Sequence, residues 1–356
     1  MPSLKEIKGR INSISSTLAI TSAMKMVAAA KLQKAQMAIQ NMLPYERRLY
    51  SMLLDLMGAM NISAAASEDG SVRGSGSAER GFDQSGDRLS LSNRHDLAGM
   101  DGAYSLMAQR EVRKVAIVAF ASNSSLCGAF NSNVIREATA VINEYRASGL
   151  GDADITVYSV GRKMAEAMRK LGFPSPADFT KMSDSPSYDA ASALAQELFD
   201  GFVSGRFDKV ELVYNHYKST SSQPTTRQTY LPLSLADATA DIQVGKITDS
   251  ASEPYADKVA EPVVRQNSPT TETPDLIVEP SKEELIATLL PKVVRLRVFT
   301  TLLDSTAAEH AARTVAMQLA TDNGNDLLQE LTLEYNKGRQ QKITSEILDL
   351  VGGSMQ

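Results

Sequence analysis

Hydrophobic positions in the first forty residues recur with alternating steps of four and three. The pattern runs through Ile7, Ile11, Ile14, Leu18, Thr21, Lys25, Ala28, Leu32, Ala35, Ile39 and Met42. This spacing is a heptad repeat, which is typical of a helix that packs along another helix. Because Pro44 is the only proline after Pro2 in this part of the chain, we predict one long helix over residues 1–60.

The same spacing returns at the other end of the chain. Its positions are Leu289, Val293, Leu296, Thr300, Leu303, Ala307, His310, Thr314, Met317, Thr321, Gly324, Leu328, Leu331 and Tyr335. A helix over residues 281–349 would span roughly 100 Å at about 1.5 Å per residue, so something must lie alongside it. Two long terminal helices that flank one central body can pair only antiparallel, and we therefore predict an antiparallel coiled coil of residues 1–60 and 281–356.

The two predicted helices differ in length. The last one exceeds the first by about a dozen residues, or roughly 18 Å. Its final turns carry four apolar residues: Ile343, Ile347, Leu350 and Val351. An apolar tip without a covering partner is an aggregation liability, so we expect another protein to sheathe it.

The central part of the chain alternates strand and helix patterns. Apolar runs predict strands at 115–120, 155–160 and 210–217, and helical stretches are predicted at 131–147, 162–171 and 188–203. This alternation predicts a small α/β sheet with crossover helices, here assigned to residues 111–235, and 226–233 adds an edge strand. Residues 61–110 and 236–280 are rich in Gly, Ser, Pro and acids, and we predict two flexible insertions there, with a short helix at 103–108 and a short strand at 242–247.

Composition excludes several classes of function. The net charge is −5, tryptophan is absent and only 6% of residues are aromatic, which argues against a generic nucleic-acid binder. The single cysteine, Cys127, excludes an internal disulfide and fits a reducing cytosol. We find neither an apolar run of about 20 residues, as a membrane helix needs, nor a leader peptide at the start.

Charge is nevertheless uneven along the chain. Residues 1–50 hold eight Lys or Arg and two Glu, a net charge of +6, which predicts an acidic neighbour along the first helix. Lys25 lies within the heptad seam. Its ammonium either meets that neighbour or extends from the groove into water.

The residues that could carry catalytic chemistry are better explained by structural roles. The loop 122–131 leads into a helix N-terminus but lacks the three glycines of a dinucleotide fingerprint, so a tight turn is the better interpretation. Cys127 is interpreted as a half-buried turn thiol rather than a nucleophile. His95, His216 and His310 fall in a linker, a strand end and a helix seam, so we predict no catalytic, cofactor-binding or metal-binding residues.

These features meet in one family. The chain resembles the γ subunits of F-type ATP synthases in six sequence strings. Two lie near its start, IKGRI at 7–11 and ITSAMKMVAAAKL at 20–32, and four lie near its end: EHAAR at 309–313, ATDN at 320–323, LTLEYNKGRQ at 331–340 and ITSE at 343–346. The turn LCGAFN at 126–131 is similar to the family's central turn, with Ser125 and Ala129 in place of glycines. The resemblance covers both ends and the middle of the chain.

The resemblance implies a fold and a function. It implies a long antiparallel coiled coil with a small Rossmann-like α/β domain, acting as the rotor shaft that couples rotation of a proton-driven c-ring to ATP synthesis or hydrolysis on the catalytic beta subunits. The partners would be alternating alpha and beta subunits, the epsilon subunit and the c-ring. The chain itself would be non-catalytic and cofactor-free, and would lie peripherally at the cytoplasmic face of the bacterial inner membrane without inserting into it.

Family motifs also imply contact residues. Met24 and Lys25 match the pair that meets an acidic loop of the beta subunit, and Arg313 and Gln340 match positions that catch a second beta-subunit loop. Arg339, Thr344 and Glu346 lie near them in the sequence. The tip residues Ile343, Ile347, Leu350 and Val351 would turn inside an apolar sleeve.

Two alternatives remain open at this point. A static coiled-coil adaptor would favour uniformly large seam residues, whereas this seam is small and polar in its middle. A small-molecule α/β enzyme decorated with helices would need a convergent polar pocket at the strand ends.

Overall fold

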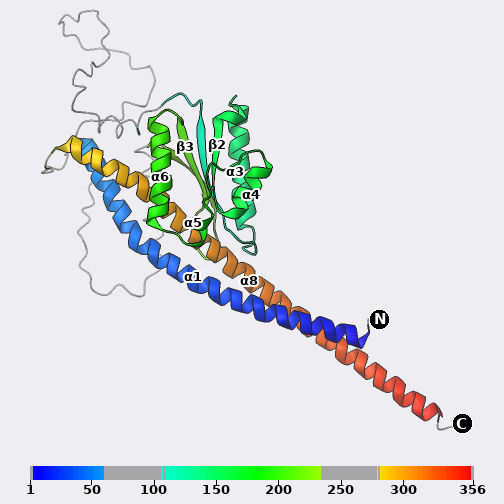
Figure 1. Cartoon of the computed structure of the whole chain (residues 1–356). Helices are drawn as coiled ribbons and strands as arrows, with labels where there is room; N and C mark the ends of the chain where they lie inside the picture. Colours follow the sequence, from blue (N-terminus) through cyan, green and yellow to red (C-terminus); the bar gives the residue numbers. More distant parts are fainter. Residues whose placement is uncertain (1–2, 60–105, 107–109, 234–278, 280, 354–356) are drawn as a thin grey trace, which may run out of the picture.

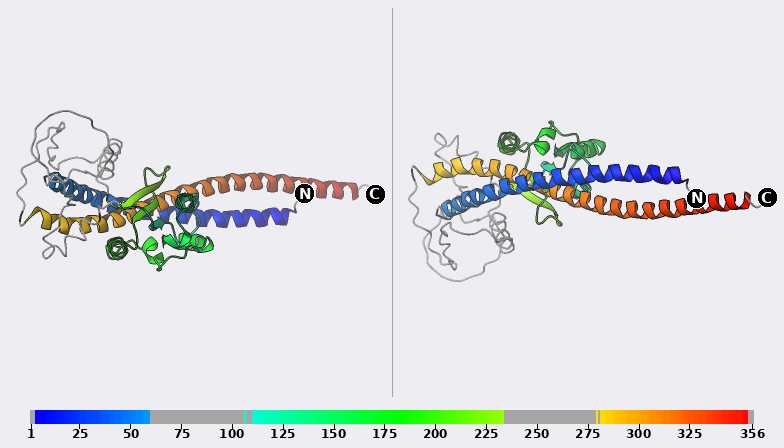
Figure 2. Two further views of the ribbon diagram at one scale, coloured as in Figure 1. Left: turned by 90° about the horizontal axis from the view of Figure 1, so that it is seen from above. Right: turned by 90° about the horizontal axis from the view of Figure 1, so that it is seen from below.

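The two predicted terminal helices form one long antiparallel pair. The computed structural model describes residues 3–59, 106, 110–233, 279 and 281–353. Helix α1 (Leu4–Ala59) and helix α8 (Lys282–Gly353) lie side by side, and α8 extends past the start of α1 (Figures 1 and 2). Pro44 and Pro291 lie inside the helices without ending them.

The heptad seams are confirmed. Every seam position predicted from Ile7 to Met42, and from Leu289 to Tyr335, is buried or half-buried. The register is set by close contacts: Leu18 lies against Gly324, Leu4 against Gly338, and the Thr321 hydroxyl donates to the Thr21 hydroxyl over 3.1 Å. Small residues occur where the helices approach most closely, because any larger side chain there would collide with the facing helix.

The central domain is a mixed sheet in the described residues. Strands β1 (Val115–Phe120), β2 (Ile155–Val160), β3 (Lys209–Asn215) and β4 (Thr225–Leu231) lie in the order β2-β1-β3-β4. The first three strands are parallel, and β4 runs antiparallel to β3 at the edge. The predicted strands and edge strand are confirmed to within two residues at each end.

Both faces of the sheet are covered by helices. Val115, Ile117 and Ala119 of β1 pack with α3 (Phe130–Ala147) and α4 (Arg162–Lys170). Ala116, Val118 and Phe120 face the other way, toward α6 (Tyr188–Val203) and the first half of α8. The short helix α5 (Thr180–Asp184) was not predicted, because one and a half turns carry too little periodicity to detect.

The shaft is therefore part of the domain's own core. The cluster beneath the sheet includes Ile286, Val294 and Leu302 of α8, together with Leu49 and Leu53 of α1. Residues off the heptad seam are thus buried in this half of α8, because the sheet covers the face that the coil leaves open.

Leu106 is buried although it lies in the range predicted as a flexible insertion. Its carbonyl accepts a hydrogen bond from the Leu233 amide over 2.9 Å, and the rest of the range 61–109 lies outside the described residues. Leu106 lies in the short apolar segment AYSLMA at 103–108, which is too brief to show a period, so the sequence did not indicate that Leu106 would be buried. The rest of the predicted helix at 103–108 and the strand at 242–247 lie outside the described residues.

Candidate partner-binding surfaces of the shaft

Helix α8 overhangs α1 at the shared end of the coil. Leu4, the first residue of α1, lies opposite Gly338, and α8 runs on to Gly353 (Figure 1). Residues 339–348, 350 and 351 are all exposed. Within the described residues this end of α8 is exposed, so its side chains can contact another protein.

Four of the sequence-predicted contact residues lie on this overhang: Arg339, Gln340, Thr344 and Glu346. The Thr344 hydroxyl donates to the Gln340 carbonyl over 2.9 Å, and the Glu346 carboxylate lies 3.7 Å from the Lys342 ammonium. The structure thus gathers these four residues on one short exposed segment.

The apolar tip is as exposed as the sequence predicted. The exposed fractions are 47% for Ile343, 55% for Ile347, 74% for Leu350 and 53% for Val351. Leu348, at 65%, belongs to the same surface and was missed because it lies off the repeat. Clustered apolar side chains on a solvent-exposed helix mark an interaction surface.

A second apolar surface lies on the middle of α1. Met24 and Lys25 are half-buried at the seam, and beside them Ile20, Met26 and Val27 are 60%, 67% and 57% exposed. The sequence did contain a signal for these three residues, since they are large apolar side chains at non-seam positions. The surface combines apolar side chains with the positive charge of Lys25.

Arg313 is placed differently from the other predicted contacts. It is only 8% exposed, its Nη2 lies 2.5 Å from Glu309 Oε1, and its Nη1 donates to the Ser125 carbonyl over 2.9 Å. Burial raises the pKa of Glu309, and the Arg313 charge only partly offsets this. The guanidinium is therefore engaged inside the chain, and the structure does not bring Arg313 together with Lys25 and Gln340 on one exposed surface.

Helix α8 also occupies the edge of the sheet where ligands bind in doubly wound folds. Those ligands bind beyond the carboxyl ends of the parallel strands. Here Cys127, in the loop after β1, and Phe130, the first residue of α3, pack on Ala308 of α8. The His216 Nδ1, just after β3, lies 2.6 Å from Asp304 Oδ2. Contacts with the shaft take up these strand ends.

The loop after β1 is a tight structural turn. Leu126 and Gly128 both have left-handed backbones, with φ of 68° and 58°. Cys127 is 1% exposed, more buried than predicted, and its Sγ accepts a hydrogen bond from the Asn131 amide over 3.1 Å. These contacts support the interpretation of Cys127 as a structural thiol.

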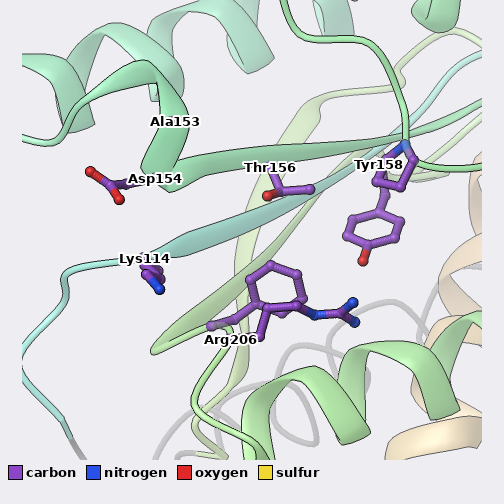
Figure 3. A pocket seen from close by; sticks show the side chains of 8 residues that line it. Lys114, Ala153, Asp154, Thr156, Tyr158 and Arg206 are labelled. Carbon is purple, nitrogen blue, oxygen red and sulfur yellow. The ribbon is translucent and has the colours of Figure 1, made fainter.

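A shallow cavity of about 250 Å³ opens at the opposite, amino-terminal edge of the sheet (Figure 3). Lys114, Asp154, Tyr158 and Arg206 contribute its polar lining. The Tyr158 hydroxyl donates to Glu197 over 3.0 Å, and the Arg206 guanidinium stacks on Phe207 and donates to the Glu197 carbonyl. These two polar groups are thus already used within the chain.

A buried ion network joins β3, β4 and α3. The Glu211 carboxylate accepts hydrogen bonds from Tyr145, Lys209 and Arg227 at 2.6–2.7 Å. Burial acts to raise the pKa of Glu211, but the bonds from Arg227, Lys209 and Tyr145 outweigh it and hold the pKa below its ordinary value. The network stays charged and fastens the edge strand to its neighbours.

The described residues contain neither a metal-binding cluster nor a membrane-spanning helix. No group of three or more His, Cys, Asp or Glu side chains there could hold a metal ion. None of the described helices combines the length and apolar character needed to cross a membrane.

Comparison with known proteins gives consistent matches. The family model described as "ATP synthase" matches residues 3–355. The "ATP synthase gamma chain" of Phocaeicola vulgatus is 47% identical over 355 residues, covering 100% of both chains. The protein of the same name from Bacteroides thetaiotaomicron is 45% identical over 356 residues, again covering 100% of both chains.

The fold is also found among solved structures. A chain of the Euglena gracilis mitochondrial ATP synthase, from a structure of its OSCP, F1 and c-ring, matches with a TM-score of 0.52 and 19% sequence identity. The match covers 99% of this chain and 93% of that one. At this identity the likeness concerns the fold alone.

Proposed function

This chain belongs to the ATP synthase gamma-chain family, and on that premise we propose that it is the central rotor shaft of a proton-translocating ATP synthase. The observation that carries the proposal is the shape of α8, which pairs with α1 over most of its length and ends in an exposed apolar overhang. A stiff paired section can transmit torque, and an exposed apolar end needs a covering protein, which would act as its bearing.

The proposed mechanism is coupling by differential contact. A ring of alternating alpha and beta subunits would surround the overhang, while the c-ring and epsilon subunit would contact the opposite end of the shaft and the α/β domain. Because α1 and α8 present different side chains around the shaft, each beta subunit would meet a different face at each rotational position. A contact that favours one conformational state over another shifts its population, and this drives the change in nucleotide affinity.

In this scheme the chain is a non-catalytic subunit. It would associate peripherally, through the complex, with the cytoplasmic face of the bacterial inner membrane. Six of the predicted residues remain proposed beta-subunit contacts: Met24, Lys25, Arg339, Gln340, Thr344 and Glu346. The proposed bearing surface consists of the four predicted tip residues, Ile343, Ile347, Leu350 and Val351, together with Leu348.

Reconstitution with the cognate alpha and beta subunits tests the proposal. The chain should assemble with them and change their ATPase rate, and the paired change Ile347→Asp with Leu350→Asp should weaken that assembly strongly, because two charges would enter an apolar sleeve. The matched control is Leu171→Asp, since Leu171 is an exposed apolar residue directly after α4, away from the shaft. Failure of the unaltered chain to assemble, or equal losses in both variants, would contradict the proposal.

The static adaptor remains the second candidate. Rotation separates the two: a bead attached to the α/β domain of the assembled complex should turn during ATP hydrolysis if the chain is a rotor. An adaptor would bind the same subunits and leave the bead still. The small residues of the seam support the rotor, because they hold α1 and α8 at close range, as a stiff shaft requires.

A further inference from the structure

The α/β domain contacts the shaft at two kinds of surface. One is the apolar core under the sheet, and such packing has no preferred direction. The other is a set of polar contacts at the carboxyl ends of β1 and β3, where the chain leaves the sheet. These polar contacts have fixed geometry and involve residues on both shaft helices.

The first polar contact holds the loop after β1. Arg313 and Glu309 form an ion pair on α8, each 8% exposed, and the Arg313 Nη1 donates to the Ser125 carbonyl over 2.9 Å. The same loop also lies near α8 at Gly128, where an added Cβ would be 3.9 Å from Ala316, an ordinary van der Waals distance.

The second polar contact holds the segment after β3. Both Asp304 oxygens are used: Oδ2 lies 2.6 Å from the His216 Nδ1, and Oδ1 accepts from the Tyr217 amide over 2.9 Å. The Tyr217 hydroxyl in turn accepts from the Gln36 side chain of α1 over 2.6 Å. This one segment therefore contacts both helices of the shaft.

We propose that these contacts form a clamp that makes the α/β domain and the coiled coil turn as one body, with Asp304, Tyr217 and Arg313 as positioning residues for rotary coupling. The inference rests on the proposed rotor function. Asp304 and Arg313 are nine residues apart on α8, which is about 13 Å along the helix axis at about 1.5 Å per residue. Two directional contacts at that separation oppose the rolling of α8 across the sheet, which apolar packing alone resists less.

The clamp also explains the burial of Arg313. The family resemblance implied that this residue touches a beta subunit, whereas its guanidinium here joins α8 to the domain. Its effect on coupling is then indirect, through the position of the loop after β1. The exposed residues of the overhang keep the proposed role of direct contact.

The test uses the whole membrane-bound complex with Asp304→Asn and Tyr217→Phe combined. These changes keep side-chain size while weakening the contact with His216 and removing the one with Gln36. We expect the complex to assemble and to hydrolyse ATP at close to the unaltered rate, while the protons pumped per ATP hydrolysed fall severalfold. That ratio is insensitive to a simple loss of folded protein, because both quantities come from the same assembled complexes.

The matched control is Glu46→Gln. Glu46 of α1 is also a buried charged residue, and it contacts two residues of α8, Arg297 at 3.4 Å and Thr300 at 3.2 Å. It should leave the pumping ratio unchanged. The clamp proposal would be wrong if the ratio of protons pumped per ATP hydrolysed stayed unchanged in the Asp304→Asn, Tyr217→Phe variant. It would also be wrong if the ratio fell equally in Glu46→Gln.

If the double variant does not assemble, the same ratio of protons pumped per ATP hydrolysed is measured with Tyr217→Phe alone, which removes a single hydroxyl. A fall in that ratio supports the clamp, and an unchanged ratio contradicts it. Failure of the unaltered chain to assemble or couple would instead contradict the proposed function. The two proposals are therefore separable by this experiment.

Discussion

At the scale of single residues, the side chains with the most unusual surroundings lie at the junctions between elements. Glu211, Arg313 and His310 are polar groups placed where strands or helices meet. Each also interacts with a residue from a remote part of the chain, and the consequences can be measured in stability and pH dependence.

Glu211→Ala should destabilise the chain by about 3–5 kcal/mol, because it leaves the partly buried Lys209 and Arg227 charges without their shared carboxylate. The measurement is the free energy of unfolding from denaturant titration. Glu144→Ala is the control, since the Glu144 side chain is 60% exposed and also pairs with Arg227. Glu144→Ala should lower the free energy of unfolding by less than about 1 kcal/mol. Equal losses in the two variants would show that Glu211 does not hold the network together.

His310 should make stability fall in mild acid. Burial, with smaller contributions from the Lys31 and Arg313 charges, lowers the pKa of His310 to about 4, and its Nδ1 has no hydrogen-bond partner in the described structure. The unfolded chain, with an ordinary pKa of about 6.5, takes up the proton first, so stability is lost as pH falls from 6.5 toward 4.

The comparison is with His310→Gln, which does not titrate. Between pH 8 and pH 5 the unaltered chain should lose about 1 kcal/mol more unfolding free energy than the variant, after allowance for partial exposure. Denaturant titration at both pH values measures this. Parallel losses in the two proteins would show that His310 titrates normally.

At the scale of elements, the helix pair depends on where its small residues fall. A Cβ at Gly324 would lie 2.6 Å from Leu18 Cδ2, whereas a Cβ at Gly9 would meet nothing within 4 Å. The two glycines share a helical backbone but differ in what faces them. Replacing each glycine with alanine therefore separates the effect of helix propensity, which both sites share, from the effect of packing against the facing helix, which only Gly324 shows.

Gly9→Ala should stabilise the chain by about 0.5–1 kcal/mol, which is the usual gain for replacing a glycine inside a helix. Gly324→Ala should gain less than that, or lose stability, because Leu18 must move to make room. Thermal or denaturant unfolding measures both changes. Equal gains would mean that the helices are not held at close range near Gly324.

At the scale of the whole molecule, folding and partner binding use different parts of α8. Its first half belongs to the core of the α/β domain, its middle pairs with α1, and its end is exposed. The proposed bearing surface therefore lies outside the part of α8 that contributes to the folded core.

Ending the chain after Lys342 should thus change the unfolding free energy by no more than about 0.5 kcal/mol, since exposed positions contribute little to stability. It should also reduce self-association, which sedimentation can measure, because the exposed apolar surface is lost. A large loss of stability would mean that the overhang packs on its own chain.

The sequence determined the parts of this protein that repeat. Seam positions such as Ile7, Leu32 and Leu296 recur at a fixed spacing because a helix presents the same face every seven residues, and the buried run of β1 is a short local pattern. The exposed tip followed from the unequal lengths of two such helices. Hydrogen bonding within a helix and periodic burial are local properties, so the sequence alone reveals them.

Only the tertiary structure decided the contacts between distant segments. It placed Arg313 against Ser125, Asp304 against His216, and Leu106 inside the core. It also showed that α8 supplies one face of the domain's core as well as half of the coil. A single buried side chain has no period, and its surroundings depend on which remote segment arrives beside it, so this information appears only when the chain is folded.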